Sequence, residues 1–310
     1  MRKFRAGVVL VTFNRLEDLK KSLLCYENQT LKPVYMIVVD NCSTDGTKEF
    51  LENWNKEDCG ISKTVITLSE NRGGSGGFYA GLKEAAERTD ADWIWVADDD
   101  AFPEVYDFEL AEKFVNEHPE EMLTVSAFCG MCEYEGRVAS VQRARFSKTF
   151  LGTHEVPVRE KEYRTKEYFE IDLYSFVGTF LRRDALLNAG LPRDDFFIYQ
   201  DDYEHAIRMG KQGKIICVPE IVIHHKDNYM FDNTVSWRDY YATRNIVIMY
   251  QTHLDKKSLR LRILRRLSVA YSSGNRMKIK VIKEAISDGK AGRTGLHPVY
   301  KPGWKDGYSQ

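Results

Sequence analysis

The chain has 310 residues, of which 43% are hydrophobic and 12% aromatic, so it can bury a substantial core and is not a largely disordered protein. Its formal net charge of -1 identifies no partner, but residues 255–293 hold twelve Lys or Arg against three acids, which predicts an acidic body and a basic C-terminal segment. No stretch reaches the roughly eighteen apolar residues of a spanning helix, and the six scattered cysteines form no disulfide framework. We therefore expect a cytoplasmic protein, soluble or bound to a surface.

The first hundred residues repeat the order of strand, loop and helix. Continuous apolar runs predict strands at residues 7–13, 34–39, 63–68 and 93–97. Helical spacing predicts helices at residues 16–27, 47–54 and 78–88, the last preceded by a glycine-rich loop at 73–77. This alternation predicts an α/β domain with a mainly parallel sheet.

Polar residues follow three of these strands. Asp40 closes the second strand, the glycine cluster follows the third, and Asp98 to Asp100 follow the fourth. In such sheets ligands bind at the C-terminal ends of the strands. We therefore expect these three features to share one crevice.

The second half of the chain is less regular. Its predicted elements are a strand at 128–141 with breaks at its glycines, a charged and mobile loop at 143–166, a strand at 173–181 that returns to the sheet, helices at 183–189 and 201–212, and short strands at 215–218 and 221–225. From Trp237 onward helical spacing dominates, with an interruption near residues 272–274.

The three adjacent aspartates are a candidate metal site. Like charges at this spacing raise one another's pKa unless a cation neutralises them. In an extended segment Asp98 and Asp100 project to the same side, so their oxygens could hold one Mg²⁺ or Mn²⁺. A solvated turn or a helix N-terminus would also favour acids. The position after an apolar strand, in the predicted crevice, favours the metal.

Three further clusters allow two interpretations each. Asp201-Asp202-Tyr203-Glu204 could supply a general base for an acceptor hydroxyl, or its acids could only cap a helix. His224-His225 could ligate a metal or contact a phosphate, or be structural. The glycine cluster could bring the backbone close to a ligand, but it matches neither the phosphate loop nor a dinucleotide fingerprint.

Several segments occur in an order that resembles a known family. They are Val9 to Arg15 (VLVTFNR), Val38 to Gly46 (VVDNCSTDG), Asp98 to Asp100, Phe197 to Glu204 (FIYQDDYE), Val218-Pro219, His224-His225 and Tyr240 to Asn245 (YYATRN). Together they resemble, over roughly residues 6 to 250, the inverting glycosyltransferases of family 2 with the GT-A fold. The resemblance implies a mainly parallel sheet flanked by helices in a catalytic domain at 1–250. Residues 251–310 would then be a helical, basic extension.

The resemblance also implies a donor site. Thr12 and Arg15 would lie against the nucleotide, and Asp40 would accept a hydrogen bond from the base. The complete set implied to bind the nucleotide sugar is Thr12, Asn14, Arg15, Asp40, Asn71, Gly73, Gly74, Asp98 and Asp99. A divalent cation, Mn²⁺ or Mg²⁺, would be bound by Asp98, Asp100 and His225. His225 matches the family histidine better than His224 because it stands six residues after Pro219.

The catalytic residues implied are Asp202 as the base, with Asp201 and Glu204 in the same motif. The family often has Glu-Asp where this chain has Asp201-Asp202, so which carboxylate takes the proton stays open. In the implied mechanism the base removes the proton of the acceptor hydroxyl during its attack on the anomeric carbon. A nucleoside diphosphate leaves in line, and the anomeric configuration inverts.

Within the family, Asn71 to Gly81 (NRGGSGGFYAG) resembles bacterial galactofuranosyltransferases. This implies UDP-galactofuranose as the donor and a growing, lipid-linked cell-surface glycan as the acceptor. A rhamnosyltransferase that uses dTDP-rhamnose is the alternative within the family, and a non-catalytic sugar-binding relative is the alternative outside enzymes. A nucleotidyltransferase would need a glycine-rich loop with a basic residue, which residues 10–20 lack.

The basic segment 256–283 interleaves Leu and Ile with Arg and Lys. This pattern suits a helix on anionic lipid, which would place the protein peripherally on the inner face of the cell membrane. A helix packed on the catalytic domain or on a second copy of the chain would show the same pattern, so a homo-oligomer stays open. No nucleic-acid partner is expected, because no recognised nucleic-acid motif accompanies the charge.

Overall fold

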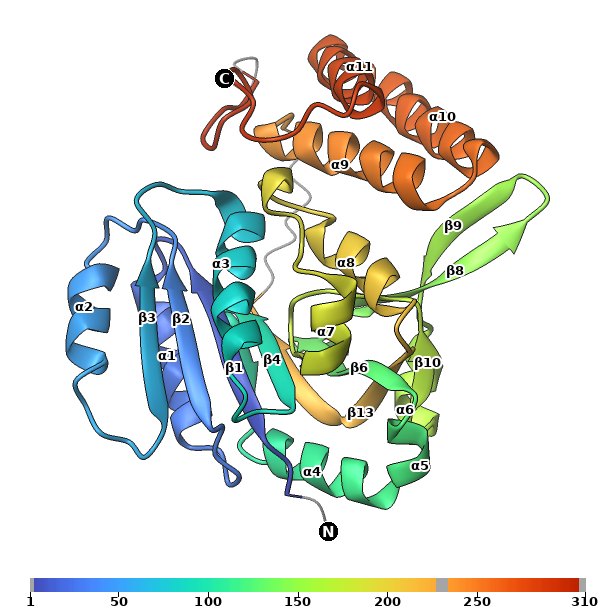
Figure 1. The fold of residues 1–310 in the computed structure, drawn as a ribbon. Helices are drawn as coiled ribbons and strands as arrows, with labels where there is room; N and C mark the ends of the chain where they lie inside the picture. The colour runs from blue at the N-terminus through green and yellow to red at the C-terminus, as the bar shows by residue number, and fades with distance from the viewer. Residues whose placement is uncertain (1–2, 227–233, 307–310) are drawn as a thin grey trace.

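The computed structural model describes residues 3–226 and 234–306, and in this part of the chain one ten-stranded mixed sheet forms the centre of the molecule (Figure 1). The strand order is β10-β13-β6-β12-β4-β1-β2-β3, with β5 paired to β13 and β7 paired to β6. A smaller sheet has the order β11-β8-β9. The α/β class and the flanking helices agree with the prediction.

The first half of the chain supplies the parallel strands β1 (Ala6–Thr12), β2 (Tyr35–Asp40), β3 (Ser62–Thr67) and β4 (Trp93–Asp98). Every residue of β1 and β2 is buried, which explains their continuous apolar sequences. The register pairs Thr12 with Asp40 and Val11 with Asp98. The strand-end acids therefore reach the same edge of the sheet, as predicted.

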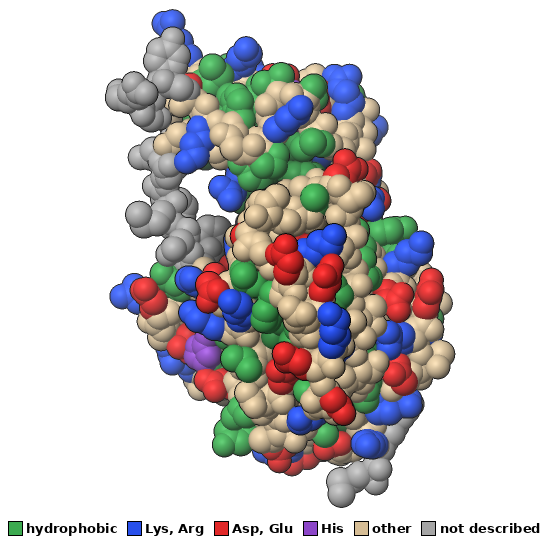
Figure 2. Space-filling view, turned by 90° about the vertical axis from the view of Figure 1, so that its left-hand side faces the viewer, with side chains coloured by type: hydrophobic (Ala, Val, Ile, Leu, Met, Phe, Trp, Pro, Cys, Tyr) green, Lys and Arg blue, Asp and Glu red, His purple; other side chains and the backbone are tan. Residues whose placement is uncertain are grey.

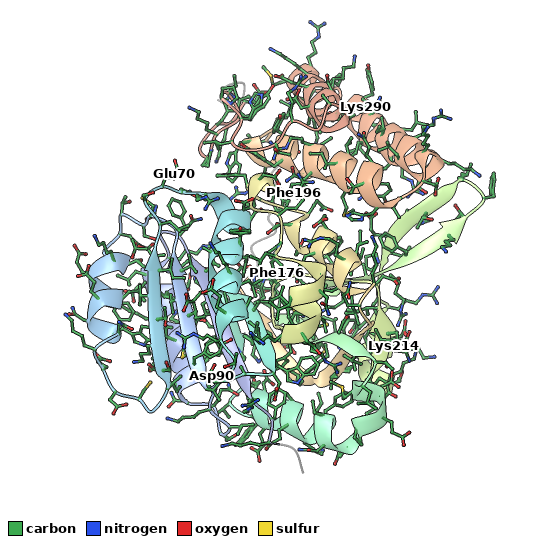
Figure 3. All side chains as sticks on the ribbon, viewed as in Figure 1. Glu70, Asp90, Phe176, Phe196, Lys214 and Lys290 are labelled. Carbon is green, nitrogen blue, oxygen red and sulfur yellow. The ribbon has the colours of Figure 1, made fainter. Side chains whose placement is uncertain are left out.

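Helices cover the sheet because successive strand residues face opposite sides. One face packs against α1 (Leu16–Glu27), α2 (Thr47–Trp54), α4 (Asp107–Glu117) and α5 (Pro119–Met122). The other face packs against α3 (Gly73–Glu87), α6 (Glu160–Thr165), α7 (Arg183–Ala189) and α8 (Asp201–Met209). Phe176, near the middle of Figure 3, belongs to this second core.

The predicted glycine loop is wrong, because α3 begins at Gly73 and the glycines form its first turn. A Cβ on Gly77 would lie 2.4 Å from Cγ1 of Val11, and one on Gly81 would lie 2.4 Å from Cγ1 of Val9. The missing side chains thus allow α3 to pack closely on β1. These glycines therefore serve close helix packing and do not form a loop before the helix.

The second half completes the sheet with β5 (Ala101–Pro103), β6 (Val125–Tyr134), β7 (Arg137–Val138), β10 (Phe169–Ile171), β12 (Thr179–Arg182) and β13 (Lys214–His225). Two short strands were predicted where β13 is one strand with an irregularity between Val218 and Val222. The predicted strand 173–181 is also two elements, since β11 (Leu173–Tyr174) belongs to the smaller sheet and β12 to the main one.

The predicted loop 143–166 is wrong as well. β8 (Arg143–Thr149) and β9 (Gly152–Pro157) form an antiparallel hairpin that projects from the body of the molecule, and α6 follows it (Figure 1). Short 3₁₀ turns lie at Ser140–Gln142 and Asp194–Phe196. Charged residues occur on both sides of the projecting ribbon, so the hairpin lacks the apolar alternation by which a strand is usually detected.

Three helices, α9 (Trp237–His253), α10 (Lys256–Ser272) and α11 (Arg276–Lys290), form the C-terminal region, with the predicted break between α10 and α11. The expected boundary at residue 250 falls inside α9. In Figure 2 Lys and Arg gather over these helices, whereas both signs of charge mix below them. Among the described residues, no helix combines the length and apolar character needed to cross a membrane.

Candidate active site

The carboxyl ends of β1, β4 and β13 and the start of α8 surround a cavity of about 640 Å³. Seven residues predicted to form the site line it: Arg15, Gly74, Asp98, Asp100, Asp201, Asp202 and His225. The lining also includes ten residues for which no role in the site was predicted: Asp18, Phe78, Gln142, Ser175, Phe176, Val177, Ile198, Tyr199, Lys226 and Arg238. The cavity thus brings together motifs from both halves of the chain.

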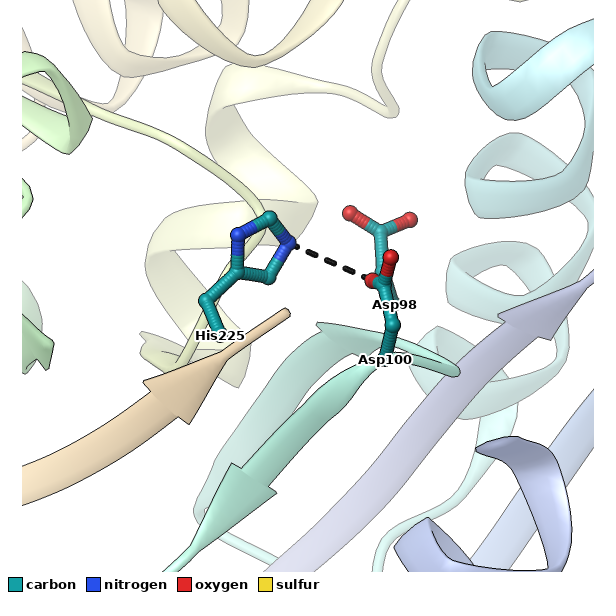
Figure 4. A group of neighbouring side chains, drawn as sticks. All are labelled: Asp98, Asp100 and His225. Carbon is teal, nitrogen blue, oxygen red and sulfur yellow. Dashed lines mark ion pairs between the residues drawn. The ribbon is translucent and has the colours of Figure 1, made fainter. Parts of the chain in front are cut away.

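The acidic triplet meets His225 at one wall of the cavity. Asp98 is the last residue of β4, and Asp100 follows two residues later. His225 is the last residue of β13, where it pairs with Ala101 of β5. One potential ligand atom from each of these three side chains lies within 4.8 Å of the others, and Nε2 of His225 is 3.2 Å from Oδ1 of Asp100 (Figure 4). His224 instead places its Nε2 2.6 Å from Oε1 of Glu104.

The same three side chains fit a divalent cation. Two carboxylates and an imidazole are ligands that Mn²⁺ and Mg²⁺ accept. Burial raises the pKa of Asp98, and the charge of Asp100 raises it further. A cation between these groups would compensate the buried negative charge. The donor set and its electrostatics therefore match the predicted metal site.

Arg15 and Thr12 hold the triplet from the side of β1. Nη1 of Arg15 lies 3.1 Å from Oδ1 of Asp99 and 2.5 Å from Oδ2 of Asp100. The Thr12 hydroxyl donates to Oδ2 of Asp99 at 2.7 Å. Burial raises the pKa of Asp99 to about 6, against the opposing effects of Arg15 and Thr12. Asp99 therefore acts as an anchor for Arg15 and Thr12.

Asp40 lies buried at the end of β2. Its Oδ1 accepts a hydrogen bond from Ser43 N at 2.9 Å, whereas its Oδ2 has no hydrogen-bond partner among the described residues. Buried polar atoms are usually paired, so this carboxylate oxygen is a candidate acceptor for a hydrogen bond from a ligand. Asp40 itself is not among the residues that line the cavity.

Three other predicted donor residues, Asn14, Asn71 and Gly73, are not among the residues that line the cavity, and they organise loops. Asn14 accepts a hydrogen bond from Thr44 N at 2.7 Å, and Asn71 accepts one from Gly73 N at 2.8 Å. Gly73 has φ +70°, and a Cβ there would lie 1.9 Å from the Phe197 carbonyl oxygen. Gly73 therefore permits the contact between α3 and the segment before α8.

The acidic motif opens α8, as predicted. Asp201 and Asp202 both line the cavity, and burial raises the pKa of each. Asp202 accepts a hydrogen bond from Tyr203 N at 2.7 Å. A carboxylate whose pKa is raised towards neutrality is suited to accept a proton at neutral pH.

Glu204 has a different environment from the two aspartates. It is not among the residues that line the cavity; it is ion-paired with Arg208 at 2.8 Å, and its Oε1 lies 2.9 Å from Nε2 of His253. Burial opposes its ionisation, but hydrogen bonds from His253 and Arg208 outweigh it and lower the pKa of Glu204 to about 2. Glu204 therefore links α8 to α9.

The segment before α8 has strained backbone. Phe197, Tyr199 and Gln200 have φ of 68°, 66° and 69°, a region that residues other than glycine seldom adopt. Such a conformation persists only where the surrounding structure enforces it. These residues immediately precede the two cavity-lining aspartates.

Buried side chains of α9 hold this segment. Nδ2 of Asn245 lies 3.0, 2.8 and 2.9 Å from the carbonyl oxygens of Phe196, Ile198 and Tyr199. Arg244 donates a hydrogen bond to the carbonyl oxygen of Phe196 at 2.9 Å. Figure 3 shows Phe196 below α9. We call Arg244 and Asn245 the α9 clamp. The sequence signal was the YYATRN segment, whose pattern does not reveal this role.

Buried Arg143 supports another part of the cavity wall. Its guanidinium donates to the oxygens of Gly130 at 3.1 Å, Ser175 Oγ at 3.0 Å and Val177 at 2.6 Å. Ser175 and Val177 line the cavity. Arg143, which was expected to lie in a mobile loop, therefore holds two residues of the cavity wall in place.

Comparisons with known proteins agree with this arrangement. The family model described as glycosyl transferase family 2 matches residues 7–188. Galactofuranosyltransferase GlfT1 of Mycobacterium tuberculosis is 38% identical over 94 residues, which cover 30% of this chain and 29% of that protein. A GalNAc(5)-diNAcBac-PP-undecaprenol β-1,3-glucosyltransferase of Campylobacter jejuni is 31% identical over 96 residues, covering 31% and 29%. These alignments thus span less than a third of each relative.

Solved structures share the fold at low sequence identity. GalNAc-T7 with UDP, GalNAc and Mn²⁺ has a TM-score of 0.64 at 15% identity and covers 93% of this chain and 56% of that one. TarS residues 1–349 of S. aureus with UDP-GlcNAc has a TM-score of 0.60 at 16% identity and covers 92% and 80%. At this identity the likeness establishes the fold alone.

Proposed function

The chain belongs to glycosyl transferase family 2, and we propose that it is an inverting, metal-dependent hexosyltransferase that moves a sugar from a nucleoside-diphosphate donor to an acceptor hydroxyl. The observation that carries this proposal is the shared cavity. It contains a potential cation site, Asp98, Asp100 and His225, together with the two carboxylates of Asp201 and Asp202 at the start of α8.

A divalent cation bound by Asp98, Asp100 and His225 would neutralise charge on the leaving diphosphate. Arg15 and Lys226, which also line the cavity, contribute fixed positive charge on the same side. Asp40 accepts a hydrogen bond from the nucleotide base through its unpaired Oδ2. Donor binding is thus assigned to the edge formed by β1, β2, β4 and β13.

Asp202 is the base of the proposed reaction. Its carboxylate takes the proton of the acceptor hydroxyl while that oxygen bonds to the anomeric carbon. The bond from this carbon to the diphosphate oxygen breaks, and the electron pair leaves with the nucleoside diphosphate. Attack opposite the leaving group inverts the anomeric configuration. Asp201 lies beside it in the cavity, and burial and the charge of Asp202 raise the pKa of Asp201.

For the sugar and the acceptor we propose UDP-galactofuranose and a growing, lipid-linked bacterial cell-surface glycan. The similarity to GlfT1 supports the sugar. The name of the Campylobacter relative, which contains undecaprenol, supports a lipid-linked acceptor. With such an acceptor, transfer would take place at the inner face of the cell membrane.

The test is a donor screen with purified protein and Mn²⁺ or Mg²⁺, in which release of nucleoside diphosphate is followed with a lipid-linked acceptor. We expect metal-dependent turnover of UDP-galactofuranose and none of UDP-galactopyranose or UDP-glucose. Turnover of dTDP-rhamnose instead would keep the reaction and replace the sugar. No release from any donor would contradict the enzymatic proposal, and pyrophosphate release would indicate nucleotidyl transfer.

A further inference from the structure

The tip of the β8–β9 hairpin exposes two large apolar side chains. Phe150 is 81% exposed and Leu151 48%, in a turn that points away from the main sheet (Figure 1). Burying such side chains in water-excluded surroundings is favourable, so their exposure in a short turn is costly unless something covers them. The exposed Lys148 lies just before this turn, in β8.

The position of this tip is fixed by α10. Thr153 N donates to Oγ of Ser258 at 2.7 Å, and a Cβ on Gly152 would lie 2.8 Å from Cα of Ser258. Glu155, further down β9, accepts a hydrogen bond from Tyr250 at 2.8 Å and pairs with Arg262 at 3.2 Å. The tip is therefore presented by the fold rather than extended at random.

The surface continues along α10. This helix contains six Lys or Arg and no acid, and its side chains at Lys257, Arg260, Leu264, Ser268 and Tyr271 are all exposed. Their spacing of three and four residues places them on one side of the helix. Leu264 is 63% exposed and Tyr271 54%. One exposed stripe thus combines apolar and positively charged groups.

Two cation–π contacts join the ends of this stripe to its neighbours. Nζ of Lys257 lies 5.9 Å from the centre of the Phe150 ring, and Nζ of Lys283 on α11 lies 5.3 Å from that of Tyr271. The hairpin tip and α10 therefore form a continuous surface. We call the residues Phe150, Leu151, Lys257, Arg260, Leu264 and Tyr271 the tip–helix face.

We propose that the tip–helix face docks on an anionic lipid bilayer. Phe150 and Leu151 enter the boundary between headgroups and acyl chains, and Lys257 and Arg260 contact lipid phosphates. The acid-free helix matches a negatively charged surface, and the aliphatic side chains match the acyl region. The proposed membrane-binding surface therefore consists of the tip of the β8–β9 hairpin, which was expected to be a loop, and one side of α10.

Two other occupants fit the face less well. A nucleic acid would use the basic residues but would offer little to Leu151 and Leu264. A second copy of the chain, packed symmetrically, would bring Lys257 and Arg260 near their own copies, and like charges at an interface disfavour association. The lipid surface matches both the charge and the apolar groups.

The experiment is sedimentation of the full chain with phosphatidylcholine vesicles and with vesicles that also contain phosphatidylglycerol. No donor or acceptor is present, so the result does not depend on the proposed sugar transfer. One variant combines Phe150→Ser with Leu151→Ser, and a second combines Lys257→Gln with Arg260→Gln. The matched control combines Leu123→Ser with Lys211→Gln, both exposed elsewhere on the protein.

We expect binding to anionic vesicles only, weakened about thirtyfold by the loss of two basic residues and also weakened in the tip variant. The control should bind like the wild type, and all variants should keep the wild-type melting temperature. Absence of binding to anionic vesicles, or equal binding by all variants, would overturn the proposal. So would a wild-type dimer that the tip variant loses, or charge-dependent binding to duplex DNA without vesicle binding.

Discussion

The two sides of the cavity are built in different ways. On the donor side, Thr12, Asp40 and Asp98 stand at the ends of buried parallel strands whose register places them at one edge. On the side of the proposed base, Asp201 and Asp202 follow a segment with three residues of positive φ, and the α9 clamp holds this segment. Regular backbone positions one set of groups, and buried side chains from a distant helix position the other.

The difference assigns separate tasks to the two sides. Changes on the donor side should alter binding of metal and nucleotide, whereas changes on the side of the base should alter turnover with the donor still bound. The largest expected effect concerns the proposed base, Asp202, and the smallest concerns the link between α8 and α9.

Replacing Asp202 by Asn should lower kcat by about 10²- to 10⁴-fold, because an amide cannot take the acceptor proton. The affinity for UDP with Mn²⁺ should stay near that of the wild type. Steady-state kinetics and calorimetry measure the two effects. Asp201→Asn is the matched comparison. If it, and not Asp202→Asn, abolishes turnover, the roles of the two neighbouring acids are reversed.

Replacing Asn245 by Leu should lower kcat about 100-fold with little change in the donor KM. The substitution removes an amide that contacts three carbonyl oxygens, so the strained segment moves and the base is misplaced. Unfolding free energy should fall by about 1–3 kcal/mol because buried carbonyls lose their donor. Turnover is measured well below the melting temperature.

Thr243→Val is the control for this variant. Thr243 is buried in the same helix, and its hydroxyl has no hydrogen-bond partner in the part of the chain that the structure describes. Its replacement should leave kcat unchanged. A variant at Asn245 that loses only stability, with wild-type kcat, would show that the α9 clamp does not position the base.

Replacing Asp40 by Asn should weaken UDP binding about tenfold, because a charged acceptor for the base is lost. Affinity for pyrophosphate with Mn²⁺ should not change, since pyrophosphate has no base. Calorimetry with both ligands separates these effects. Equal losses for the two ligands would place Asp40 at the diphosphate rather than at the base.

The smallest effect concerns pH and Glu204. Its pKa is lowered to about 2 in the folded protein from an ordinary value of 4.5, so its stabilising contribution is complete above that ordinary value and is lost as the pH falls towards 2. Melting temperatures at neutral pH and at about pH 3 should differ less in Glu204→Gln than in the wild type. Glu160→Gln, which alters an exposed ion pair, should keep the wild-type difference. An unchanged difference in Glu204→Gln would exclude this link as a source of acid sensitivity.

The same contrast explains what the sequence predicted. Strands buried on both faces leave continuous apolar runs, so β1, β2 and β4 and the acids at their ends were located to within a residue or so. The three side chains predicted to bind the cation lie close together in the structure, and His225 had been joined to the two aspartates only by the resemblance to a family pattern. Local signals were therefore sufficient for these strands and the acids at their ends, but not for His225.

The features that the sequence did not predict depend on contacts between residues far apart in the chain. Gly73 and Gly77 were predicted to lie in a loop, but they allow close packing on other elements. Asn245 donates a hydrogen bond to Tyr199, which lies 46 residues earlier in the chain, and no local sequence pattern predicts this contact. Arg143 lies in a hairpin whose charged residues conceal its strands. These features follow from tertiary packing, which a single sequence does not display.

The most direct test of separate donor and base sides is calorimetric titration of UDP in the presence of Mn²⁺ into two variants, Asp100→Asn and Asn245→Leu. Asp100→Asn should lose most of the metal-dependent affinity, because it changes one of the three proposed ligands. Asn245→Leu should bind UDP like the wild type although its turnover is low. If Asn245→Leu loses UDP affinity to the same extent as Asp100→Asn, the two sides do not act separately and the assignment is wrong.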